Sequence, residues 1–445
     1  MTAITNSTTQ ATTDAELLQR FGPIFDRIAA ESVRREVERE LPYAAIEELR
    51  AAGFGAVRLP LEHGGLGISI PQLLRLLVAL GEADSNLVQI LRAHFAFVEG
   101  RLVSDSEADR ALWLPRIAAG AIFSAAMAER TEATRNTVTI RRTEDGPGWR
   151  VDGRKFYCTG TLYSDWIVAS AMDGEDRVAV AIATDAPGVT RVDDWDGFGQ
   201  RLTGSGTTVF ENVPVAEEQI LRRFNVDEAR ADTYITAFYQ LFHLGALAGI
   251  SRAVLRDATA FVQAKTRVFG VPGTSSPRQD PLVQRVVGRL SSLAFAAESI
   301  VDGVAQACQR AYEAKLAGTV TPAHYDEADI KAFQGQQVAI DLVLQATGLL
   351  FEVGGASATA EHRRLDRHWR NARTLASHNP AILREQALGD YYLNGVVPGQ
   401  AWAARWKEAG RQARDEAAPP DAGDAPDAAG APEPAAEALQ HSPSP

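Results

Sequence analysis

The stretch "RNARTLASHNP", residues 370–380, places a histidine and an asparagine directly before a proline. His378 has a side chain whose ordinary pKa of about 6.5 lets it gain or lose a proton near neutral pH, which suits general acid–base chemistry. Because Pro380 disfavours helical backbone just before it, the stretch also fits a helix end at which His378 is only structural. The residues alone leave both interpretations open.

The other histidines and the cysteines give no metal-ligand pattern. No His, Asp or Glu cluster has the spacing of a metal site, such as two histidines four residues apart on a helix, so no metal is predicted. Cys158 and Cys308 lie far apart in the sequence, which gives no disulfide framework. His94 lies in the helical stretch "QILRAHFAFVE", where a histidine is ordinarily structural.

Composition excludes several classes of protein. The 445 residues include 45% hydrophobic and 23% charged side chains, as in a globular protein with more than one core. The formal charge of −12 argues against general binding to nucleic acid or to an anionic membrane. No run of eighteen apolar residues occurs, and the first residues lack the order of a signal peptide, so the sequence predicts a cytoplasmic enzyme.

The elements that must position these residues follow from the hydrophobic period. Apolar residues recur every three or four positions in two long regions, which predicts helices, and short β-prone runs between Gly-containing turns separate those regions. The β-prone runs predict an antiparallel barrel or sandwich. The sequence therefore divides into a disordered leader (1–13), an N-terminal helical domain (14–121), a β-barrel domain (122–225), a C-terminal four-helix bundle domain (226–412) and a disordered Ala/Pro/Asp-rich tail (413–445).

This order of domains resembles the acyl-CoA dehydrogenase fold, which is mostly α with a central β domain. Several motifs resemble those of the family in the same order along about 390 residues. They are "LPLEHGGLGIS" (59–69), "VDGRKFYCTG" (151–160), "FGQRLTGSGTTVFENVPV" (198–215) and "RVFGVP" (267–272). The resemblance implies a flavin cofactor and a homotetramer, because this family builds each flavin site across subunits.

The dehydrogenases of this family need a carboxylate base, and the resemblance places that base at Asn379, whose amide cannot accept a proton. The alternative position, within residues 239–251, contains no Asp or Glu. The segments around 195–207 and 369–380 are similar instead to the flavin-dependent monooxygenase branch, which includes dibenzothiophene monooxygenases and sulfur-acquisition oxidoreductases. That branch commonly carries two histidines three residues apart, and this chain has Leu375 and His378 there.

The resemblance assigns roles to individual residues. It implies that His378 and His94 are catalytic and that Asn379 and Leu375 contact the substrate. The residues it assigns to the flavin are Tyr157, Thr159, Ser205, Thr207, Arg267, Arg373 and Glu129. For Ser205 and Thr207 an ordinary β-turn is an equal alternative.

The implied activity is that of a two-component monooxygenase. A separate NAD(P)H-dependent flavin reductase supplies reduced FMN, which reacts with O2 to give a C4a-hydroperoxyflavin. This species then oxygenates a small organic substrate, with organosulfur and aromatic compounds as candidates. FAD is the alternative cofactor. The alternative functions are an acyl-CoA dehydrogenase with a displaced carboxylate, for which Glu352 is the candidate, and a non-catalytic flavin-binding homologue.

Overall fold

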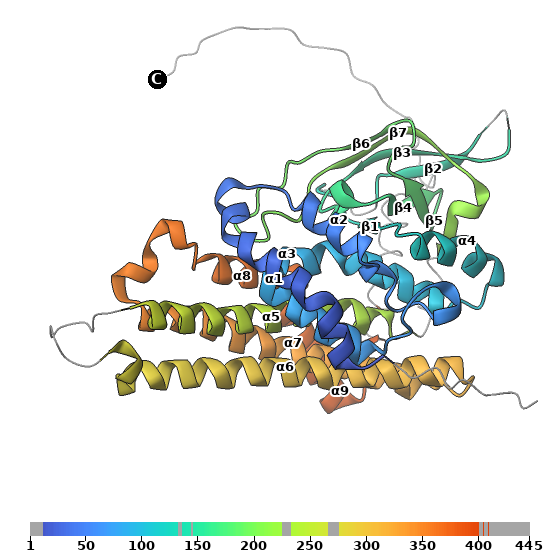
Figure 1. Ribbon diagram of the computed structural model, residues 1–445. Helices are drawn as coiled ribbons and strands as arrows, with labels where there is room; N and C mark the ends of the chain where they lie inside the picture. Colours follow the sequence, from blue (N-terminus) through green and yellow to red (C-terminus); the bar gives the residue numbers. More distant parts are fainter. Residues whose placement is uncertain are drawn as a thin grey trace, which may run out of the picture.

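The computed structural model describes residues 12–131, 136–143, 146–224, 233–265 and 276–399, together with 404 and 408. Most of the predicted leader, the predicted tail and Arg267 lie outside the described residues. The described part divides into helices, a sheet and helices in the predicted order (Figure 1).

Four helices come from the predicted N-terminal domain, within the described part of the chain. They are α1 (Asp14–Glu38), α2 (Tyr43–Ala51), α3 (Ile70–Leu102) and α4 (Glu107–Ala118). Polar side chains begin α3: the hydroxyl of Ser69 accepts a bond from the Gln72 amide, and the Gln72 side chain accepts one from the Ser69 amide. The helix bends at Asp84, where the backbone is not helical.

The described β-strands form one mixed sheet of β1 (Phe123–Ala126), β2 (Thr139–Arg142), β3 (Trp149–Lys155), β4 (Trp166–Asp173), β5 (Asp176–Ala183), β6 (Val189–Arg191), β7 (Thr208–Val215) and β8 (Ile220–Phe224). The strand order is β6-β7-β3-β2-β4-β5-β8, and β1 also pairs with β4. Both β1 and β2 pair with β4 in parallel, so the sheet is not wholly antiparallel as predicted. Alternation of side chains across the strands buries a separate apolar core.

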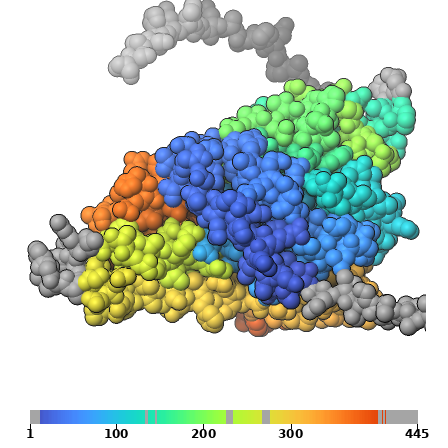
Figure 2. Space-filling view, in the orientation of Figure 1, coloured from blue at the N-terminus to red at the C-terminus, as the bar shows by residue number. Residues whose placement is uncertain are grey.

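The C-terminal part contains α5 (Ile235–Ala264), α6 (Pro281–Leu316), α7 (Pro322–Leu349), α8 (Arg367–His378) and α9 (Ala381–Asn394). Of these described helices, α5, α6 and α7 are long and run side by side, whereas α8 and α9 are shorter (Figure 1). Figure 2 shows the N-terminal helices filling the space between the sheet domain and the C-terminal helices on this face. No helix among the described residues is long and apolar enough to span a membrane.

Two glycines set the contact between α3 and α5. A Cβ atom added at Gly249 would lie 2.5 Å from the backbone carbonyl carbon of Gly81, so the two backbones touch. The helices run antiparallel from this point, which brings Arg92 of α3 to Tyr239 of α5. The glycine contact therefore fixes which side chains of the two helices meet further along.

Candidate active site

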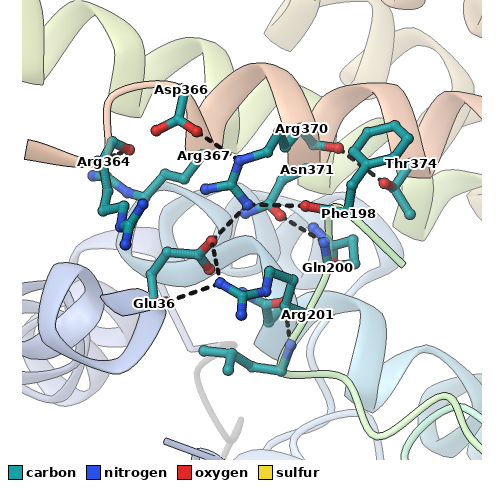
Figure 3. A network of polar contacts seen from close by, with 12 residues as sticks. Glu36, Phe198, Gln200, Arg201, Arg364, Asp366, Arg367, Arg370, Asn371 and Thr374 are labelled. Carbon is teal, nitrogen blue, oxygen red and sulfur yellow. Dashed lines mark hydrogen bonds and ion pairs between the residues drawn. The ribbon is translucent and has the colours of Figure 1, made fainter. Parts of the chain in front are cut away.

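The first turns of α8 are fixed by a polar network (Figure 3). The guanidinium of Arg370 forms ion pairs at 2.7 Å with Glu36 of α1 and at 2.7 Å with Asp366. It also donates a hydrogen bond of 2.9 Å to the carbonyl of Phe198. One side chain thus joins α8 to the first helix and to the loop between β6 and β7.

That loop also packs directly on the backbone of α8. The side-chain oxygen of Asn371 accepts a hydrogen bond of 2.6 Å from the Gln200 amide. A Cβ atom at Gly199 would lie only 2.0 Å from the carbonyl oxygen of Arg370, so only glycine fits there. These contacts hold α8 in one position and so determine where its last residue, His378, lies.

The last turn of α8 faces the helical bundle. The ring centroid of His378 lies 4.4 Å from that of His243 on α5. The side-chain amide of Asn379 donates to Gln240 of α5 at 2.8 Å, and Gln336 of α7 donates to the Asn379 carbonyl at 3.0 Å. The α8–α9 junction is therefore joined to α5 and α7 through polar contacts.

His243 is one of two residues of this site that sequence reasoning missed; the other is Arg92. The side chain of His243 is 1% exposed, and neither ring nitrogen has a hydrogen-bond partner among the described residues. Burial lowers the pKa of His243 well below its usual range, and the charge of Arg92 lowers it further. The only sequence signal was a polar pair three residues apart, Gln240 and His243, in an apolar helix.

Arg92 of α3 is a cation whose charge acts on both histidines of this pair. Its Nε donates to the Tyr239 carbonyl at 3.2 Å, and its guanidinium carbon lies 4.7 Å from the centre of the Tyr239 ring. No carboxylate within the described ranges forms an ion pair with it. Burial lowers the pKa of Arg92 to about 10, so it stays charged at neutral pH.

His378 is neutral in this setting. By its accessible surface His378 is exposed, although its ring lies against that of His243. Partial loss of hydration to the neighbouring protein atoms, with the nearby charge of Arg92, lowers the pKa of His378 to about 3. Its Nδ1 lies 3.3 Å from the side-chain oxygen of Asn379, a weak hydrogen bond. If Nδ1 carries the proton, Nε2 is an acceptor. Leu375, one turn earlier, belongs to the apolar core.

His94 has other partners. The ring is fully buried, its Nε2 lies 2.9 Å from the Gly55 carbonyl oxygen, and its Nδ1 accepts a bond of 3.3 Å from the Phe123 amide. Both nitrogens are therefore used inside the protein, which fixes the tautomer with the proton on Nε2. Burial lowers the pKa of His94 to about 4. This geometry leaves no ring nitrogen for a substrate.

Among the predicted flavin residues, Tyr157 has the most unusual conformation. Its φ of 67° lies in the left-handed region, and the side chain is 51% exposed beside Trp195, with ring centroids 6.2 Å apart. Such backbone strain in a non-glycine residue is concentrated at functional sites. The hydroxyl of Thr159 lies 2.8 Å from that of Ser205, which lies 2.7 Å from that of Thr203. An exposed aromatic face beside hydroxyl groups suits a flavin.

Glu129 and Thr207 are engaged within the β domain. Glu129 forms a buried ion pair of 2.6 Å with Lys155; burial opposes ionisation, but this contact and bonds from Thr137 lower the pKa of Glu129. The hydroxyl of Thr207 donates to Asp194 at 2.6 Å. Both residues border an open cavity of about 350 Å³ that Phe156 also lines.

Two further candidates lie at the periphery. Arg373 is half-buried on α8 and donates to the Ser377 hydroxyl at 3.3 Å. The exposed Glu352 lies in a short 3₁₀ helix whose last residue, Val353, accepts a bond from Lys265 at the end of α5. Lys265 follows His243 by 22 residues, which along a helix is roughly 30 Å. The structure does not bring Glu352 to the His243 and His378 pair.

The comparisons with known proteins agree with this architecture. The family described as acyl-CoA dehydrogenase, N-terminal domain, matches residues 23–121, and acyl-CoA dehydrogenase, C-terminal domain, matches residues 241–381. A dibenzothiophene monooxygenase of Rhodococcus qingshengii is 26% identical over 385 residues, which cover 83% of this chain and 91% of the relative. The probable FMNH2-dependent monooxygenase SfnC of Pseudomonas putida is 25% identical over 384 residues, 84% of this chain and 94% of that protein.

A solved structure is similar over nearly its whole length. The FMN-bound crystal structure of TdsC from Paenibacillus sp. A11-2 has a TM-score of 0.79 and 26% identity, covering 86% of this chain and 98% of that one. The described helices and mixed sheet thus follow the arrangement of an FMN-binding protein.

Proposed function

Because this chain belongs to the acyl-CoA dehydrogenase family, in its flavin-dependent monooxygenase branch, we propose that it is the oxygenase component of an FMN-dependent monooxygenase. The observation that carries the proposal is Asn379. It stands at the α8–α9 junction, and its side chain is an amide, which cannot act as a base and which donates a hydrogen bond to Gln240. Residues 235–256 of α5 contain no Asp or Glu either. The site thus offers histidines in place of a carboxylate.

Tyr157, Thr159 and Ser205 are the residues that we propose to hold the flavin ring. The strained, exposed Tyr157 would present an aromatic face, and the linked hydroxyls would offer hydrogen bonds. Arg373 and Arg267 remain the proposed phosphate partners, since a guanidinium pairs well with phosphate oxygens. For Glu129 we propose an indirect role through Lys155, because its carboxylate is already paired.

The finer proposal concerns the reaction. A separate NAD(P)H-dependent reductase would deliver reduced FMN. The reduced FMN would activate O2 as a C4a-hydroperoxide. The neutral His378 would hold or move a proton next to the reacting oxygen. For His94 the hydrogen bonds argue for a structural role between the N-terminal segment and β1.

The test is transfer of oxygen from ¹⁸O2. The protein is mixed with FMN, NADH, a flavin reductase and a panel of organosulfur and aromatic compounds, with catalase present to remove free peroxide. We expect one ¹⁸O atom in a product. In a separate mixture with oxidised flavin and an acyl-CoA but no NADH or reductase, bleaching of the flavin without ¹⁸O uptake would identify a dehydrogenase instead. FMN binding with neither reaction would identify a non-catalytic homologue.

A further inference from the structure

We propose, building on the monooxygenase function, that the substrate carries a negatively charged group, a carboxylate or a sulfur oxoanion, which Arg92 binds beside His243 and His378. The proposal starts from the guanidinium of Arg92. Its Nε is bound to the Tyr239 carbonyl, whereas its two terminal amino groups have no protein acceptor within the described part of the chain. A partly buried cation without an acid partner lowers the stability of the folded state, unless a ligand supplies the negative charge.

The second, independent observation is His243. Buried polar atoms in proteins are nearly always hydrogen-bonded, yet both nitrogens of this buried ring lack partners among the residues that the structure describes. His243 follows Tyr239 by one helical turn, so it lies on the same side of α5 as the Arg92 contact. An oxygen atom of a ligand held by Arg92 would therefore have a hydrogen-bonding group directly beside it.

The surrounding charges favour an anion. Arg384 of α9 is a second cation of this region, bonded to Gln336, with Asp329 of α7 as the nearby acid. The other polar neighbours, Gln240 and Asn379, are neutral. A site for an uncharged aromatic ring would not need this set of polar groups. The local excess of positive charge therefore distinguishes an organic anion from a neutral substrate.

The experiment measures binding in the absence of flavin and oxygen. Benzenesulfinate and benzoate are the two anionic probes, and methyl phenyl sulfone and benzamide are their neutral counterparts, titrated calorimetrically into the protein in chloride-free buffer. We expect at least one anion to bind roughly tenfold or more tightly than its neutral counterpart. A preference for benzenesulfinate would indicate a sulfur oxoanion, and one for benzoate a carboxylate.

The matched variants are Arg92→Met, Arg92→Lys and Arg75→Met. Arg92→Met should lose the anion preference, and Arg92→Lys should keep part of it. Arg75 lies on the same helix but is exposed and paired with Asp14 and Asp302, so its variant should bind like the wild type. Thermal melting and FMN binding would show that each variant is folded.

The proposal would be overturned by neutral probes that bind as tightly as the anions, by no anion binding at millimolar concentration, or by an unchanged preference in folded Arg92→Met. Failure of the monooxygenase proposal has a different signature. In that case the anions bind through Arg92, but no product contains ¹⁸O.

Discussion

His378 and His243 lie with their ring centroids 4.4 Å apart, and each has a pKa depressed by burial and by Arg92. Two neutral imidazoles side by side can offer both a donor and an acceptor to one ligand. At the scale of single residues, the pairing with His243 supports a chemical role for His378, which its place at a helix end alone does not.

The first prediction is that His378→Ala lowers oxygenation by roughly a hundredfold or more, as removal of a general acid or base does. FMN affinity should change little, because no predicted flavin contact involves this ring. Product formation and quenching of FMN fluorescence measure the two effects. A variant that loses FMN binding would instead assign His378 a structural role.

A second prediction concerns His94 and acid stability. Its folded pKa of about 4 lies below the ordinary value of about 6.5, so the unfolded state binds more protons between these pH values. The free energy of unfolding should therefore fall as the pH falls from about 6.5 to about 4, with roughly 3 kcal/mol from this residue.

Replacement by Gln removes that titration, so urea unfolding of His94→Gln should show a shallower pH dependence across this window. The exposed His63, changed to Gln, serves as the control. An equally steep slope in His94→Gln would contradict the assigned environment.

At the scale of elements, the crossing of α3 and α5 at Gly81 and Gly249 positions the site. Arg92 and Tyr239 lie eleven and ten residues from this crossing. A shift of the two helices at the crossing would therefore also move the Arg92–Tyr239 contact. Backbone contact at a glycine pair leaves no room for adjustment by side-chain rotation.

We therefore predict that Gly249→Ala destabilises the fold by about 1–3 kcal/mol through overpacking and reduces activity. Gly303→Ala is the matched control. It also lies within a long helix, yet nothing stands within 4 Å of an added Cβ, so it should be neutral or stabilise by up to about 1 kcal/mol. Urea unfolding compares the two, and equal effects would show that the glycine contact is not tight.

The sequence predicted most of the helical and β regions, but few of the long-range contacts between them. Hydrophobic periods and turn residues located the helical and β regions, because those signals are local. The parallel pairing of β1 and β2 with β4 depends on long-range contacts and was missed. His378 could be selected because it stands beside Asn379, whereas Arg92 and His243 belong to ordinary helical stretches that only packing brings together.

At the scale of the whole molecule, apolar side chains remain exposed on the C-terminal helices. On α6, Leu282 is 73% and Phe295 is 74% exposed. Water contact of such large side chains is unfavourable, and a covering subunit would relieve it. The homotetramer expected from the family resemblance would supply that cover.

The corresponding prediction is that Phe295→Glu reduces the molar mass measured by light scattering after gel filtration, from a tetramer to smaller species. Leu18→Glu replaces an exposed leucine of α1 and serves as the control. A monomeric wild-type protein would contradict the proposed assembly.

The ion pair between Arg370 and Glu36 joins residues that are 334 positions apart in the chain. Substitutions in the first helix can therefore change the turn that ends at His378, although they touch no ligand. A directed-evolution library aimed at a new substrate range should randomise positions around Glu36 as well as the residues that line the site. Variants recovered there would alter turnover while leaving the chemical groups of the site unchanged.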